Sequence, residues 1–141
     1  MLRQATAVWN GGLKDGKGTL STPTQVLTNT PYTFVTRFEN TSGTSPEELV
    51  AAAHAGCFSM ALSADLGRAG LTPQRIETTA EVTLETVDGK PTVTKVLLKT
   101  RAAVPGADRA SFERIANETK ATCPISRLLN AKITLEASLE G

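Results

Sequence analysis

The sequence has no excess of charge of either sign and no run of basic residues interleaved with aromatics. Fifteen Lys and Arg residues against fourteen Asp and Glu residues give a formal net charge of +1. A nearly neutral chain has little electrostatic attraction for nucleic acid or for an anionic membrane surface. We therefore expect neither as a partner.

Long apolar runs are also missing. The longest, residues 49–64, is interrupted by His54, Ser59 and Ser63, and it falls short of the ~20 residues that a membrane-spanning helix needs. Residues 1–12 contain no apolar stretch of signal-peptide length. These absences predict a soluble, cytoplasmic protein.

Cysteine is scarce, with two residues in 141. There is no CxxC motif and no Cys/His cluster, so we expect no metal site and no cofactor. Two cysteines in a reducing compartment are not expected to form a permanent structural crosslink, and each could simply be a buried apolar thiol. The length fits a single domain, residues 1–141.

The order of patterns along the chain predicts an α+β fold. We expect strands at residues 2–10, 17–21 and 32–38, a polar loop at 39–44, a long hairpin from 76–87 and 92–104 around Asp88-Gly89, helices at 108–121 and 124–130, and a strand at 131–140. The hairpin strands alternate, with Glu on the outer face of one and Lys or Arg on the outer face of the other. Opposite charges on paired strands favour an antiparallel ladder.

A helix is predicted to begin with a full set of signals. Ser45 can cap it, Pro46 suits its first position, and Glu48 lies three residues after the cap. The body runs to Gly67 or Gly70 and is apolar nearly all round. Such a helix should be buried on most sides, and a partner subunit could supply part of the covering surface.

Two cysteines lie in settings with different chemistry. Cys57 is in the middle of the apolar helix, where burial would raise its pKa. His54 lies three residues earlier on the same face, so it is either a base or a packed side chain. Cys123 directly precedes Pro124, at the expected start of a short helix, where backbone amides would stabilise a thiolate. A thiol at such a chain bend would be accessible.

Two segments resemble the OsmC family (osmotically inducible protein C), relatives of the organic hydroperoxide resistance proteins. The segment TRFENTSGTSPEELVAAAHAGCFSMALS carries the first cysteine, and ATCPISRLL is similar to the family's second cysteine motif. GKGTLST, the long hairpin and the VPG turn match in the same order. The resemblance implies antiparallel sheets around a buried central helix, in an intertwined homodimer whose two sites are formed by both chains.

For this sequence the resemblance implies four site residues. Cys57 would be the peroxidatic cysteine and Cys123 the resolving one. Arg37, expected on a strand, would polarise the thiolate and the peroxide, and Glu47 would hold that arginine. The substrate would be an organic hydroperoxide and the reductant a lipoyl-type dithiol. The arginine in TRFEN indicates the OsmC branch, because the loop NGGLKDGKGT has no arginine.

Helix geometry adds a constraint. Ten residues of continuous helix separate Glu47 from Cys57, a rise of about 15 Å, so Glu47 must act through Arg37 or across a dimer. Phe34, Phe38, Phe58 and Met60 could line an apolar pocket or belong to a core.

Three other functions stay open from the residues alone. A thiol redox sensor would use the same disulfide without turnover. A Cys–His hydrolase would depend on Cys57 and His54 but not on Cys123. A small-molecule binding domain would tolerate the loss of both thiols.

Overall fold

The computed structural model describes residues 1–39 and 43–140. The chain divides into two compact units, Met1–Leu49 and Val50–Gly141, and the prediction of one domain over 1–141 stays a prediction. Residues 40–42 of the predicted loop 39–44 lie outside the described residues.

The first unit contains an antiparallel sheet in the order β1-β2-β3, formed by β1 (Thr6–Asn10), β2 (Lys17–Ser21) and β3 (Thr30–Tyr32). The strand predicted at 17–21 is confirmed, and the one predicted at 2–10 begins only at Thr6. Gly18 lies between two aromatic rings: a Cβ there would come within 2.6 Å of both Trp9 and Tyr32. A glycine is therefore required for these rings to face each other across β2, at 5.5 Å between centroids.

The strand predicted at 32–38 is wrong. Residues 34–38 form a short helix, α1 (Phe34–Phe38), and only Tyr32 belongs to β3. The cause is a reciprocal capping box: the Thr36 N–H donates to Thr33 Oγ1, and the Thr33 N–H donates to Thr36 Oγ1. These bonds satisfy the free N–H groups of a helix start and outweigh the β propensity of the segment. Arg37 therefore lies on a helix.

The second unit contains a three-stranded sheet in the order β4-β5-β6, formed by β4 (Arg75–Val87), β5 (Lys90–Ala103) and β6 (Lys132–Glu140). The predicted hairpin is confirmed, and its turn has positive φ at Asp88 (52°) and Gly89 (77°), as a two-residue hairpin loop requires. The predicted charge pairing is also present, with Lys99 Nζ 3.0 Å from Glu81 Oε2.

The expectation of purely antiparallel sheets is wrong for β6, which pairs with β5 in parallel. Two helices connect them, α3 (Arg109–Thr122) and α4 (Pro124–Leu128), and together they carry the chain back so that β6 runs in the direction of β5. The inward positions predicted for β6 alternate with exposed ones as expected. The α+β class is confirmed.

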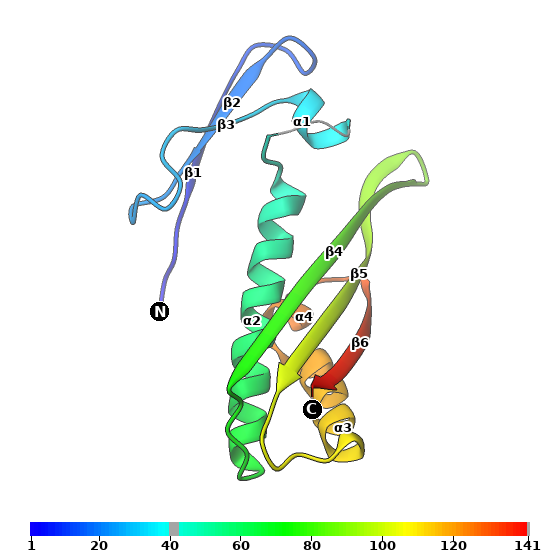
Figure 1. Cartoon of the computed structure of the whole chain (residues 1–141). Helices are drawn as coiled ribbons and strands as arrows, with labels where there is room; N and C mark the ends of the chain where they lie inside the picture. Colours follow the sequence, from blue (N-terminus) through cyan, green and yellow to red (C-terminus); the bar gives the residue numbers. More distant parts are fainter. Residues whose placement is uncertain (40–42, 141) are drawn as a thin grey trace. The chain divides into compact units, whose positions relative to one another are not determined.

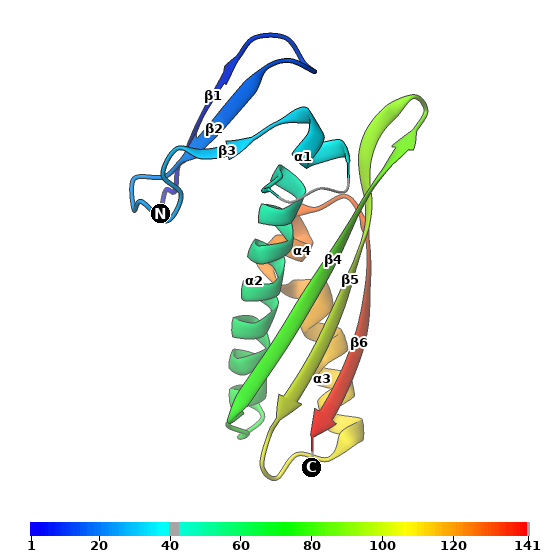
Figure 2. The same cartoon turned by 45° about the horizontal axis from the view of Figure 1, so that its top comes forward.

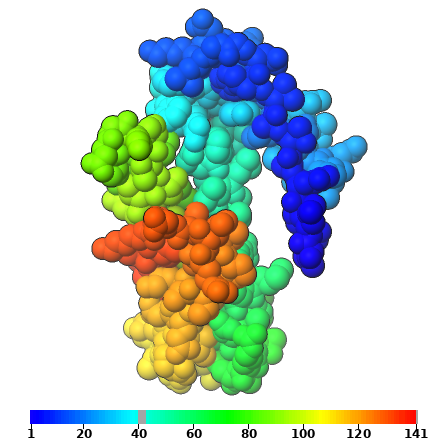
Figure 3. Space-filling model, turned by 180° about the vertical axis from the view of Figure 1, so that it is seen from behind, coloured from blue at the N-terminus to red at the C-terminus, as the bar shows by residue number. Residues whose placement is uncertain are grey.

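The predicted central helix is α2 (Pro46–Arg68), capped by Ser45 Oγ, which accepts the Glu48 N–H at 3.1 Å. Within the second unit, α2 and α3 lie along the same face of the β4-β5-β6 sheet (Figures 1 and 2). From behind, α3 lies beside the C-terminal half of α2 (Figure 3). The inner face of α2 is fully buried and consists of His54, Phe58, Leu62 and Leu66.

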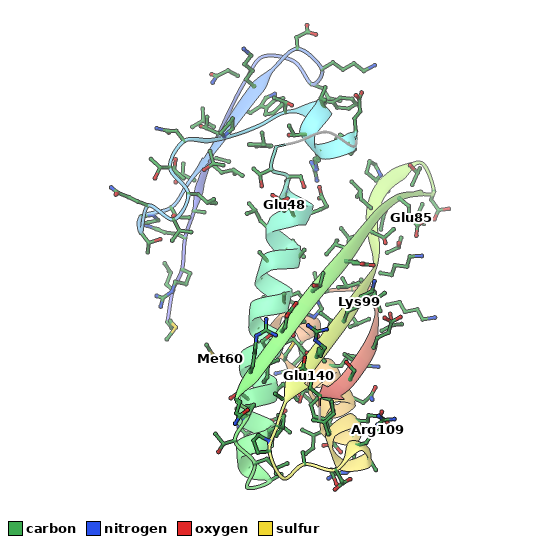
Figure 4. The ribbon with its side chains drawn as sticks, in the orientation of Figure 1. Glu48, Met60, Glu85, Lys99, Arg109 and Glu140 are labelled. Carbon is green, nitrogen blue, oxygen red and sulfur yellow. The ribbon has the colours of Figure 1, made fainter. Side chains whose placement is uncertain are left out.

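The prediction that α2 is buried on most sides is wrong for the single chain. Its opposite face is exposed, and Met60, with 77% of its surface exposed, points away from the sheet (Figure 4). The 23-residue helix, with a mean hydropathy of 1.4 over 18 residues, is long and apolar enough to cross a membrane, which corrects the expectation that the stretch falls short. Because its inner face packs in the core of the second unit, α2 is the core helix of a soluble fold.

Candidate active site at the two cysteines

The fold brings the two cysteines together. Cys57 comes from the middle of α2, and Cys123 lies at the junction of α3 and α4. Both thiols are free, and the Cys123 side chain hydrogen-bonds the Cys57 thiol. Cys57 is half-buried, whereas Cys123 is only 1% exposed. The expectation of an accessible thiol at residue 123 is therefore wrong.

The environment of Cys57 favours the thiol form. Burial raises the pKa of Cys57, and neighbouring Cys123 raises it further through charge repulsion and their hydrogen bond. One group acts in the opposite sense: the backbone N–H of Ile125 bonds the sulfur and lowers the pKa. Ile125 is the second residue of α4, where the N–H has no partner inside the helix and is free to donate.

Cys123 occupies the predicted position between the two helices, but its sulfur does not bond the N–H groups at the start of α4. It is the N-terminal cap of α4 by backbone position, yet its side chain makes no capping hydrogen bond. The backbone N–H of Ile125, at the start of α4, instead bonds the Cys57 sulfur. The Cys123 sulfur lies 3.0 Å from Ser126 Oγ, one turn along α4.

Ser126 links Cys123 to a histidine. His54 Nε2 lies 2.7 Å from Ser126 Oγ, while His54 Nδ1 is buried and has no partner among the described residues. Burial lowers the pKa of His54, so this imidazole is neutral at pH 7. Ser126 was not predicted from the sequence, although its position three residues after Cys123, in a helical turn, was a usable signal.

The second pair of predicted residues lies in the first unit. Arg37 on α1 holds Glu47 in the first turn of α2 through two parallel bonds, Nε to Oε1 at 3.1 Å and Nη2 to Oε2 at 3.3 Å. The Glu47 side chain is 14% exposed and that of Arg37 is 40% exposed. A two-point contact of this kind fixes the plane of the guanidinium.

An apolar pocket adjoins Arg37. It has a volume of about 270 Å³ and is lined by Trp9, Leu13, Tyr32, Thr33, Phe34, Arg37 and Phe38. Phe34 and Phe38 thus line a pocket, as the sequence suggested. Phe58 is instead fully buried in the core of the second unit, and Met60 is exposed.

The four predicted site residues therefore form two pairs, Cys57 with Cys123 and Arg37 with Glu47. Helix α2 is continuous from Pro46 to Arg68, so Glu47 and Cys57 are separated by about 15 Å of helix. Among residues 1–39 and 43–140, no three His, Cys, Asp or Glu side chains are grouped to hold a metal ion.

Comparison with known proteins gives consistent matches. The model of the OsmC-like protein family matches residues 39–138. The chain is 52% identical to peroxiredoxin OsmC of Escherichia coli K12 over 139 residues, which cover 99% of this chain and 97% of that protein. The crystal structure of an OsmC-like protein from Mycoplasma pneumoniae has a similar fold, with a TM-score of 0.76 at 16% identity over 100% of this chain and 99% of the other. The organic hydroperoxide resistance protein OhrB of Bacillus subtilis superposes with a TM-score of 0.70 at 23% identity, over 95% and 97% of the two chains.

Proposed function

The chain belongs to the OsmC family and is a cysteine-based peroxidase, and we propose that it reduces organic hydroperoxides in the cytoplasm through Cys57 and Cys123. The observation that carries this proposal is the contact between the two thiols, which lie on segments 66 positions apart. The half-buried Cys57 is the group that can meet a substrate, and the buried Cys123 is the group that can trap the product of oxidation.

The first step is attack on the peroxide. The Cys57 thiolate attacks the distal oxygen of ROOH, the O–O bond breaks, and the alkoxide takes a proton and leaves as the alcohol. Cys57 becomes a sulfenic acid. The Ile125 N–H stabilises the thiolate, but burial and Cys123 oppose it. Within residues 50–140 no Lys or Arg contributes to the pKa of Cys57, so the step needs a cation from elsewhere.

Arg37 is the proposed cation. Among the described residues, Glu47 takes two of the five N–H donors of Arg37, and other donors of the guanidinium are proposed to bind the Cys57 thiolate and the peroxide oxygens. An opposite charge close to a thiol lowers its pKa by roughly 1–3 units. The adjoining pocket of about 270 Å³ offers aromatic walls to an alkyl or aryl R group.

We propose that Arg37 reaches Cys57 of a second subunit in a homodimer. Glu47 and Cys57 lie too far apart along α2 to touch directly, and the exposed apolar face of α2 around Met60 offers a surface for a partner. A mixed dimer tests this. Chains carrying Arg37→Ala and chains carrying Cys57→Ser are each expected to be inactive, and their mixture is expected to regain about a quarter of the wild-type activity.

That quarter follows because random mixing puts half of the chains in mixed dimers, each with one complete site. A mixture that stays inactive, with subunit exchange verified by mass spectrometry, would exclude the action of Arg37 across the interface.

The second step resets the enzyme. Cys123 displaces hydroxide from the Cys57 sulfenic acid, forming a disulfide and water, and a dithiol then reduces the disulfide by exchange. We propose a lipoyl-type dithiol as the reductant.

The test is turnover of cumene hydroperoxide with dihydrolipoamide as the only reductant. Wild type is expected to turn over repeatedly, Cys57→Ser not at all, and Cys123→Ser once, stopping at the sulfenic acid. Oxidation of both thiols without turnover would favour a redox sensor, and thiols that stay reduced would refute the peroxidase mechanism.

A further inference from the structure

A buried hydrogen-bonded chain leads from Cys123 to the only histidine in the sequence. Cys123 Sγ is 3.0 Å from Ser126 Oγ, and Ser126 Oγ is 2.7 Å from His54 Nε2. The exposed fractions are 1% for Cys123, 7% for Ser126 and 0% for His54. The three side chains come from the α3–α4 junction, α4 and α2, so only the folded second unit assembles them.

Packing alone does not account for this arrangement. His54 Nδ1 is buried without a partner among the described residues, and such an unsatisfied group costs roughly 1–3 kcal/mol. An apolar side chain of similar size would avoid that cost. Within the described part of the chain, the side-chain hydrogen bond of the imidazole is to Ser126, which in turn bonds Cys123.

The chemistry of the three groups is suited to moving a proton. A serine hydroxyl can accept one hydrogen bond while donating another, so Ser126 can receive the thiol proton and pass on its own. Because burial lowers the pKa of His54, the ring is neutral at pH 7 and can accept a proton. Burial opposes a positive charge on the ring, so His54 holds the proton only transiently.

We propose that Ser126 and His54 form a proton relay for Cys123, an inference that rests on the proposed function. In disulfide formation the Cys123 proton passes to Ser126 Oγ while the Ser126 proton passes to His54 Nε2. The Cys123 thiolate attacks the Cys57 sulfenic sulfur, the S–S bond forms and the S–O bond breaks. The sulfenic sulfur is reduced and the Cys123 sulfur oxidised. Hydroxide leaves, and the proton given up by His54 completes a water molecule.

The relay also works in reverse during reduction. Cys57 is half-buried and Cys123 is buried, so the thiolate of a dithiol reductant reaches the Cys57 sulfur and Cys123 is the leaving group. The S–S bond breaks, a mixed disulfide forms on Cys57, and Cys123 departs as a thiolate. Ser126 then donates a proton to the Cys123 sulfur, and His54 restores the Ser126 proton.

The experiment separates the two oxidation steps in the full-length protein. Rapid mixing with one equivalent of cumene hydroperoxide gives the peroxide-consumption rate. Quenching with an alkylating agent, followed by mass spectrometry, gives the rate of Cys57–Cys123 disulfide formation. The variants are Ser126→Ala, Ser126→Thr, which keeps the hydroxyl, and His54→Gln, which keeps a polar side chain but cannot take up a proton near pH 7. Thr100→Val is the matched control, because it removes a buried hydroxyl that bonds Thr78 and the Glu77 carbonyl instead.

The relay predicts a selective effect on the second step. Peroxide consumption should stay within about twofold in every variant. Disulfide formation should slow by about 10²-fold in Ser126→Ala and His54→Gln, the lower range for positioned proton transfer, and Ser126→Thr should recover most of the rate. In the slow variants disulfide formation should speed up as the pH rises, because hydroxide in the solvent then takes the proton that the relay no longer accepts.

Two results would overturn the relay. One is disulfide formation at the wild-type rate and with the wild-type pH profile in Ser126→Ala. The other is an equal loss of both steps in Ser126→Ala and Thr100→Val, which is what a structural role alone would give. A wild-type protein that consumes no peroxide would instead refute the proposed function, and the relay with it.

Discussion

Replacing Arg37 by lysine tests the proposed site most directly. The substitution keeps the positive charge but removes the planar fork that binds both Glu47 oxygens, at 3.1 and 3.3 Å. A lysine ammonium carries its three donors on one nitrogen, so it cannot bind both Glu47 oxygens in a planar fork and hold a fixed orientation toward a second ligand. Arginine can do both, because its remaining N–H groups lie on the far side of the guanidinium.

The expected loss has two parts. Removing one preorganised donor from a developing negative charge costs about 10²–10³ in rate. The pKa of Cys57 is already raised by burial and by Cys123. Each unit by which the arginine lowers that pKa therefore increases the fraction of Cys57 thiolate at pH 7 about tenfold. We therefore expect Arg37→Lys to consume cumene hydroperoxide at least about 10²-fold more slowly, with its pH midpoint shifted upward.

The assay is stoichiometric peroxide consumption between pH 6 and 10, with the pH dependence of Cys57 alkylation measured in parallel. Glu47→Gln should fall between wild type and Arg37→Lys, since its amide oxygen still accepts one bond. Arg75→Lys is the matched control, because Arg75 pairs with Glu77 on the exposed face of β4. A wild-type rate and pH midpoint in Arg37→Lys would refute the idea that the fork aligns a cation on the thiolate.

Two further predictions concern stability. Burial lowers the pKa of His54 below its ordinary 6.5, so below about pH 6.5 the unfolded chain binds a proton that the folded chain does not, and the free energy of unfolding falls as pH decreases. Urea unfolding between pH 5 and 7.5 should show this slope in wild type and lose it in His54→Gln; an unchanged slope would assign it to other groups. Phe58 is completely buried, so Phe58→Ala should cost about 3–5 kcal/mol, whereas Val87→Ala at the exposed hairpin end should change stability by less than about 0.5 kcal/mol.

Local signals predicted the elements whose causes lie within a few residues. The Ser45 cap, the Asp88-Gly89 turn and the alternation along β4 and β5 all appear where the sequence indicated them. The same kind of reasoning failed at 32–38, because the Thr33–Thr36 capping box is as local as β propensity and stronger there. It also failed for β6, whose direction depends on how α3 and α4 carry the chain back to the sheet.

The sequence by itself determined the two cysteine motifs, the helix that carries Cys57, the α+β class and the family resemblance, because each is written in contiguous residues. Only the tertiary structure decided that Cys57 and Cys123 are in contact and that the Ile125 N–H bonds the Cys57 sulfur. It also decided that Ser126 hydrogen-bonds both Cys123 and His54. These contacts join side chains from α2 to a turn more than 60 residues later. Burial, which sets the direction of the Cys57 and His54 pKa shifts, exists only once α2 has packed against the sheet and α4.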